Sequence, residues 1–141
     1  MPAEGLERFV AAQAGGYDDA LAELRRGHKT GHWMWWVFPQ DAALGRSDTA
    51  RRNAIRDLAE AEAYLAHPVL GPRLIAAAEA MLAHAGTPPE AVLGGIDALK
   101  LRSSMTLFAQ VPDAPAVFAD VLRAFHGGTP DPLTLARVGS R

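Results

Sequence analysis

Residues 69–86 have the sequence VLGPRLIAAAEAMLAHAG. Its apolar side chains recur at the spacing of one helix face. The expected buried stripe comprises Leu70, Leu74, Ala77, Ala78, Met81 and Leu82. Gly86 is expected to close the helix, because glycine readily takes the left-handed conformation found at helix ends. The segment therefore predicts a long amphipathic α-helix near the middle of the chain.

The composition of the whole chain extends this helical pattern. Ala and Leu account for 44 of the 141 residues, whereas Val and Ile account for 11. This ratio favours helix over sheet, because β-branched side chains are the ones that strands prefer. Periodicity and capping signals predict about eight short to medium helices and no convincing strand. We therefore expect an all-α, compact single domain spanning residues 1–141, with its sequence motifs between about 5 and 138.

The other expected helices are marked by apolar spacing and by residues that favour helix ends. They cover residues 4–14, residues 17–26, the aromatic block up to Phe38, a helix after Ser47 that carries Arg51, Arg52 and Arg56, residues 57–66, a short helix capped by Thr87, one capped by Asp97, one capped by Asp113 and a last one after Asp131. In the first of them, the polar Gln13 falls on the apolar face.

Several protein classes are excluded or disfavoured by what the chain lacks. It has no cysteine, which removes disulfide scaffolds, thiol nucleophiles and thiolate metal sites, and which fits a cytoplasmic protein. No apolar run is long enough for a membrane span, and the first residues do not resemble a signal peptide. Phosphate-binding and dinucleotide-binding glycine motifs are absent.

Positive charge is concentrated in residues 25–56. This region holds seven arginine and lysine residues against two aspartates, so it carries +5, and the rest of the chain, whose total charge is -2, carries -7. A basic region on an acidic protein indicates either an anion-binding cleft or an electrostatic footprint for a partner.

An aromatic block, HWMWWVFPQ at 32–40, follows a polar loop with two glycines. Trp33 and Trp36 would share a helical face and are interpreted as core, whereas Trp35 points to another face and could stack on a planar ligand. His28 and His32 flank Lys29 in the loop, and a metal site there is disfavoured because no carboxylate or cysteine lies near.

The remaining polar groups have structural and functional interpretations. His67, His84 and His126 lie at expected helix C-termini, where imidazole suits the terminal carbonyls. Ser103 and Ser104 either bond back to the carbonyl four residues earlier or, together with Lys100, bind an anion.

Four stretches carry a resemblance to a known family: RFVAAQ at 8–13, HWMWWVFPQ at 32–40, EAEAYLAHPVLGPRL at 60–74 and LKLRSSMTLF at 99–108. In order and spacing they resemble a bacterial family of unknown function, numbered 1810 and often labelled calpastatin. The resemblance covers nearly the whole chain and implies a compact all-α domain, with no established activity. Trp36 stands where the family pattern has Phe or Tyr.

The leading functional hypothesis is a cytoplasmic protein that binds a small planar anion, such as a nucleotide or an ADP-ribose-like molecule, in an aromatic and basic cleft. The expected ligand-binding residues are Lys29, Trp33, Trp35, Gln40, Arg46, Ser47, Lys100, Arg102, Ser103 and Ser104. If the protein is an enzyme, His32 is the candidate acid or base, because imidazole titrates near neutral pH. No cofactor and no metal is predicted. The alternative is a nucleic-acid or protein interaction module that uses residues 25–56.

Overall fold

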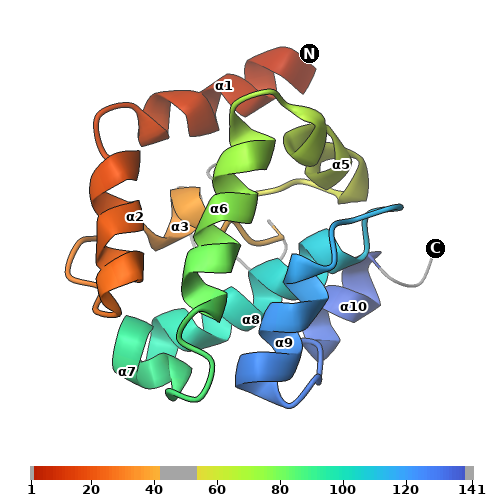
Figure 1. Cartoon of the computed structure of the whole chain (residues 1–141). Coiled ribbons are helices and arrows are strands. Elements are labelled where there is room, and N and C mark those ends of the chain that lie inside the picture. Colours follow the sequence, from red (N-terminus) through yellow and green to blue (C-terminus); the bar gives the residue numbers. More distant parts are fainter. Residues whose placement is uncertain (1, 42–53, 139–141) are drawn as a thin grey trace.

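The structure is a computed structural model that describes residues 2–41 and 54–138. Over these residues the chain forms nine α-helices, labelled as in Figure 1. They are α1 (Pro2–Gln13), α2 (Tyr17–Arg26), α3 (Met34–Val37), α5 (Leu58–Ala66), α6 (Leu70–Leu82), α7 (Pro89–Leu93), α8 (Gly95–Ala109), α9 (Val117–His126) and α10 (Pro132–Val138). Within the described residues, β-structure is limited to one bridge between Asp41 and Ile55. The all-α prediction is confirmed.

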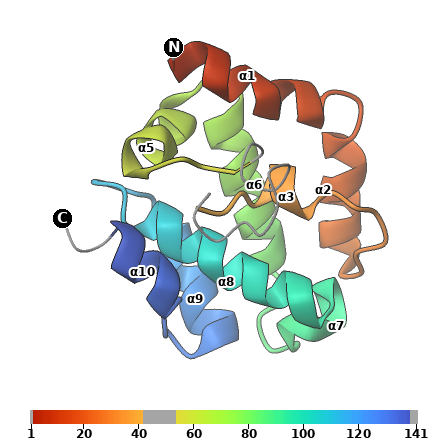
Figure 2. The same cartoon turned by 180° about the vertical axis from the view of Figure 1, so that it is seen from behind.

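Helix α6 occupies the centre of the arrangement. It contacts α2, α3, α5 and α9, while α8 runs behind it and contacts α5, α7, α9 and α10 (Figures 1 and 2). The stripe predicted for residues 69–86 is buried as expected, except that Leu82 is half-buried. A Cβ atom on Gly71 would lie 2.2 Å from the carbonyl oxygen of Leu65, so only glycine permits the close approach between the end of α5 and the start of α6.

A chain of four aromatic rings joins the helices across the core. Phe9 of α1 meets Tyr64 of α5 edge to face, with ring centroids 5.3 Å apart. Tyr64 lies 5.4 Å from Phe108 of α8, which lies 5.8 Å from Phe118 of α9. All four side chains are fully buried. Such offset and edge contacts stabilise the fold beyond area burial alone, by about 0.5–1.5 kcal/mol for each pair.

Several predicted helix starts are displaced, because local turns compete with side-chain capping. Helix α7 has Pro88, and not Thr87, at its N-cap. Helix α8 begins at Gly95, so Asp97 lies inside its first turn and is free to form ion pairs. Asp113 adopts a left-handed backbone, with a φ angle of 60°, and α9 begins only at Val117.

The start of α10 agrees with the sequence prediction. The Asp131 carboxylate accepts hydrogen bonds from the backbone N–H and the hydroxyl of Thr134, at 2.9 and 2.7 Å. An aspartate that accepts from the third residue after it is the usual N-terminal cap. The prediction that Asp131 starts the last helix is therefore confirmed.

The three histidines expected at helix C-termini differ in their partners. A ring nitrogen of His84 lies 2.7 Å from the carbonyl oxygen of Leu24, in the last turn of α2. His67 follows α5, but its Nδ1 accepts N–H groups at the start of α6, at 3.1 and 3.2 Å. His126 ends α9, and its Nε2 is buried without a hydrogen-bond partner among the described residues. Only His84 therefore engages a helix-terminal carbonyl, and that carbonyl belongs to another helix.

Candidate functional site

The loop that precedes the aromatic block is organised by one carboxylate, that of Glu23. Its Oε1 accepts the backbone N–H groups of Thr30 and Gly31 and the indole N–H of Trp33, at 2.7, 2.9 and 2.9 Å. Desolvation opposes ionisation, but these hydrogen bonds outweigh it and lower the pKa of Glu23 to about 2. The buried indole N–H of Trp33 therefore has a hydrogen-bond acceptor, as a buried tryptophan usually does. The same carboxylate holds the loop in one conformation.

The predicted lysines meet at Asp97 in the first turn of α8. Lys29 Nζ lies 2.9 Å from Asp97 Oδ2, and Lys100 Nζ lies 3.7 Å from Oδ1 of the same carboxylate. Lys29 also donates to the carbonyl of Gly31 at 2.6 Å and lies 5.2 Å from the centre of the Trp33 ring. The structure thus brings Lys29, Trp33 and Lys100 together. The ammonium of Lys29 is already paired, and its side chain is only 9% exposed.

The aromatic block divides as its spacing predicted. Trp33 is buried and Trp36 is half-buried in the core, whereas Trp35 is 40% exposed. His32 is exposed, and Gln40 is half-buried with its carbonyl accepting from Ile55 N–H at 2.7 Å.

The polar residues of α8 serve other contacts. Arg102 donates to the carbonyls of Thr129 and Pro130, which fixes the connection between α9 and α10. Ser103 bonds back to the carbonyl of Leu99 at 3.3 Å, as the structural interpretation predicted. Ser104 is fully buried, and its hydroxyl has no partner among the described residues.

Two of the predicted ligand-binding residues, Arg46 and Ser47, lie outside the described residues, as do Arg51 and Arg52. Over the rest, Lys29, Trp33 and Lys100 gather around Asp97, whereas Arg102 and Ser103 make the separate contacts described above and the Ser104 hydroxyl is buried without a partner among the described residues. Ligand binding by these residues stays a prediction.

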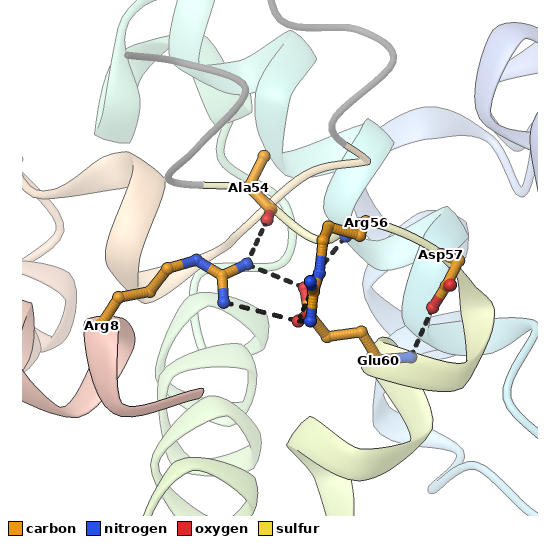
Figure 3. Close-up of polar contacts among 5 residues, drawn as sticks. All are labelled: Arg8, Ala54, Arg56, Asp57 and Glu60. Carbon is orange, nitrogen blue, oxygen red and sulfur yellow. Dashed lines mark hydrogen bonds and ion pairs between the residues drawn. The ribbon is translucent and has the colours of Figure 1, made fainter. Parts of the chain in front are cut away.

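A buried carboxylate in the first turn of α5, that of Glu60, joins two arginines, and we call this group the Glu60 clamp (Figure 3). Arg8 of α1 donates to Glu60 Oε1 at 2.8 Å and to the carbonyl of Ala54 at 2.6 Å. Arg56 donates to both oxygens of Glu60, from its backbone N–H at 3.0 Å and from its guanidinium at 2.9 and 3.1 Å. Burial disfavours the charged form of Glu60, yet these bonds prevail and its pKa is lowered.

Helix α5 begins next to the clamp. Asp57 is its N-cap and accepts the Glu60 N–H at 2.8 Å. The chain from Ala54 to Asp57 is not helical, so the predicted helix through Arg56 does not extend to that residue. The clamp connects α1 to α5, which makes it a structural feature.

A hollow of about 310 Å³ opens at the turn between α1 and α2, beside α6. It is lined by residues 13–19 and by Arg73 of α6. In Figure 1 this turn lies at the upper left, at the end of α1. No predicted site residue lines it, so the hollow is a candidate site that the sequence-based prediction did not include.

Arg73 is held in one orientation at this hollow. Its Cζ lies 5.0 Å from the centre of the Tyr17 ring, and its Nη1 donates to Gln13 Oε1 at 3.1 Å. The Tyr17 hydroxyl donates to the backbone carbonyl of Arg73 at 2.6 Å. Burial raises the pKa of Tyr17, so the phenol stays protonated at neutral pH.

Gln13, the partner of Arg73, is itself buried, with only 2% of its surface exposed. Its Nε2 donates to the carbonyl of Trp36 at 2.8 Å and to the Tyr64 hydroxyl at 3.2 Å. The Trp36 ring covers Gly16, where a Cβ atom would lie 3.1 Å from the ring. A glutamine on an apolar stripe was the one signal in the sequence that pointed to this site, because a buried amide needs polar partners.

The described ranges contain no group of three or more histidine, aspartate and glutamate side chains placed to hold a metal ion. None of the helices traced here is both long and apolar enough to cross a membrane.

The comparison with solved structures agrees with the fold. A solved structure, that of the conserved hypothetical protein Rv1873 from Mycobacterium tuberculosis, is 46% identical in sequence and superposes with a TM-score of 0.92. The match covers 96% of this chain and 97% of that one. Among curated proteins, none matches this chain. The model of the family described as protein of unknown function (DUF1810) matches residues 3–138, and the chain therefore belongs to this family.

Proposed function

We propose that the protein binds a small ligand through an anionic group, a carboxylate or a phosphate, at the hollow lined by residues 13–19 and Arg73. The observation that carries this proposal is the state of the Arg73 guanidinium. One of its N–H groups donates to Gln13, and the described residues offer no hydrogen-bond acceptor to the others. Arginine presents a planar fork that matches the paired oxygens of carboxylate and phosphate.

The guanidinium is also prepared for binding before the ligand arrives. Its contacts with the Tyr17 ring and with Gln13 restrict its rotamers, so less conformational entropy is lost when an anion binds. The anchor itself is firm, because Gln13 is tied to Trp36 and Tyr64 in the core. A charge-assisted hydrogen bond contributes about 1.5–3 kcal/mol, which supports specific binding by a small group.

The size of the hollow limits what it can enclose. Its volume of about 310 Å³ is at the lower end of the range of about 300–1,000 Å³ typical of ligand sites. A nucleotide or an ADP-ribose-like molecule, which the sequence suggested, would therefore place one part inside and leave the rest on the surface. The Tyr17 ring already carries Arg73 on one face. The anionic group, more than a planar ring, is thus the feature the site favours.

The experiment is a ligand-dependent thermal shift, followed by calorimetry, on the wild type and matched variants. The probes are AMP, ADP-ribose, ribose 5-phosphate and inorganic pyrophosphate. Arg73→Gln removes the charge and Arg73→Lys keeps it without the fork. Arg123→Gln is the control, because Arg123 is an exposed arginine that pairs with Asp120 and lies outside the hollow.

We expect at least one probe to raise the melting temperature of the wild type and of Arg123→Gln, through preferential binding to the folded state. The shift should vanish in Arg73→Gln and weaken in Arg73→Lys. Trp35→Ala serves as a further arm, because Trp35 belongs to the cleft predicted from sequence and does not line the hollow. Loss of binding in Trp35→Ala with full binding in Arg73→Gln would refute the proposal and favour that cleft.

One part of the sequence-based hypothesis, a cytoplasmic location, accompanies this proposal as a prediction. A cytoplasmic location rests on the absence of cysteine from the chain. No reaction is proposed, because His32, the candidate acid or base, does not line the hollow.

A further inference from the structure

The charge of the hollow differs from that of a simple anion site. Arg73 contributes one positive charge, whereas Asp18 and Asp19 contribute two negative charges, which gives the lining a net charge of -1. Both aspartates are exposed, and neither has an ion pair or a side-chain hydrogen bond within the described part of the chain. A ligand with negative charge alone would be attracted by the guanidinium and repelled by both carboxylates.

We infer that the ligand of this hollow is a zwitterion, with a carboxylate or phosphate that binds Arg73 and an ammonium group that faces Asp18 and Asp19. The inference rests on the proposed function and narrows it to a class of ligand. The anionic group of a zwitterion would pair with Arg73 and its ammonium group with the two aspartates. This charge complementarity favours a zwitterion over a ligand that carries only negative charge.

The two aspartates also have a structural role, which the test must separate from binding. They occupy the first turn of α2, where carboxylates interact favourably with the positive end of the helix. Arg25 and Arg26 in the last turn complement the other end. A substitution of the aspartates can therefore lower stability without any effect on a ligand. For this reason, the decisive quantity is a ratio of two affinities measured on the same variant.

The experiment compares matched pairs of ligands by calorimetry or by NMR titration of the full chain. Glycine, β-alanine and γ-aminobutyrate are set against acetate, propionate and butyrate, and phosphoethanolamine against ethyl phosphate. Each pair differs by the ammonium group. The series also varies the separation of the two charges, so its best member reports the distance across the hollow. The variants are Asp18→Asn/Asp19→Asn and, as a control on an exposed carboxylate outside the hollow, Glu62→Gln.

In the wild type and in Glu62→Gln, we expect the best zwitterion to bind about fivefold more tightly than its matched anion, as for an exposed ion pair. In Asp18→Asn/Asp19→Asn that ratio should fall to about one, because the ammonium loses its partners. Binding of the plain anion should become stronger in the same variant, since the net charge of the lining changes from -1 to +1.

The outcomes distinguish this inference from the proposed function. If plain anions bind the wild type as tightly as the zwitterions, and Arg73→Gln abolishes that binding, the zwitterion inference is wrong and the proposed function stands. If the ratio is unchanged in the double variant, the inference is also wrong. If no probe of either series binds in a manner that depends on Arg73, both are overturned.

Discussion

The Glu60 clamp is expected to stabilise the fold, and the substitution Glu60→Gln tests this. Glu60→Gln keeps the volume of the side chain but removes the charge that two guanidiniums share (Figure 3). The amide nitrogen would also place donors against the donors of Arg8 or Arg56. The Glu60 side chain is 5% exposed, so water cannot replace the lost acceptor.

The magnitude follows from the exposure of the three partners. Loss of one member of a buried ion pair costs about 3–5 kcal/mol, and loss of an exposed pair costs about 0–1 kcal/mol. The Arg8 side chain is 23% exposed and that of Arg56 is 61% exposed, so the first pair dominates and is itself partly screened. We expect Glu60→Gln to lower the free energy of unfolding by about 2–3 kcal/mol. For a chain of this length, that corresponds to a fall in melting temperature of about 5–12 °C.

The assay is urea and thermal unfolding at several pH values, with Glu62→Gln on the same helix as the control. The pKa of Glu60 is lowered in the fold, so its stabilising effect is complete well above the ordinary value of 4.5 and is lost as pH falls through the folded value. The difference between wild type and Glu60→Gln should therefore be large at neutral pH and shrink in acid. A difference below about 0.5 kcal/mol at neutral pH, the usual range for surface changes, would refute the clamp as a stabilising feature.

Three further predictions concern separate parts of the chain. Burial, assisted by Arg102, lowers the pKa of His126, so the wild type should lose more stability than His126→Gln as pH falls through 6.5; parallel pH profiles would contradict this. Glu23→Gln removes the carboxylate that accepts the Trp33 indole N–H, so hydrogen exchange of this N–H, measured by NMR, should become faster. An unchanged exchange rate would show that burial alone protects the indole N–H. If residues 25–56 form a nucleic-acid footprint, filter binding to DNA and RNA should be retained at low salt and lost as salt rises, and no retention at micromolar protein would dismiss that alternative.

The sequence predicted those parts of the fold that depend on regular apolar spacing. The stripe from Leu70 to Met81 is buried because α6 packs on several helices at once, and any packing partner would select the same face. Helix starts were predicted less well, since they depend on local competition. Asp97 was expected to cap α8, but Lys29 draws its carboxylate into an ion pair across the chain. Nothing in the local sequence around Asp97 reveals a partner from residue 29.

The candidate site shows the same limit more clearly. Arg73 lies within residues 69–86, where the apolar stripe predicted a helix but the arginine had no predicted role, and its neighbour in space, Gln13, is sixty positions away. Spacing along the chain shows which side chains share one helix face, but not which faces of different helices meet. Within the basic region of residues 25–56, the fold already pairs Lys29 with Asp97 and Arg56 with Glu60. A cation that is already paired must give up its ion pair before it can bind a ligand, and that costs free energy. A cation that is held in place but still has donors without acceptors avoids this cost. Arg73 is oriented in this way, since its fork has only Gln13 as a partner within the described residues. Under the proposed function, the indicator of the ligand site is therefore not the density of positive charge but the mismatch between the donors of one arginine and the acceptors that the fold supplies.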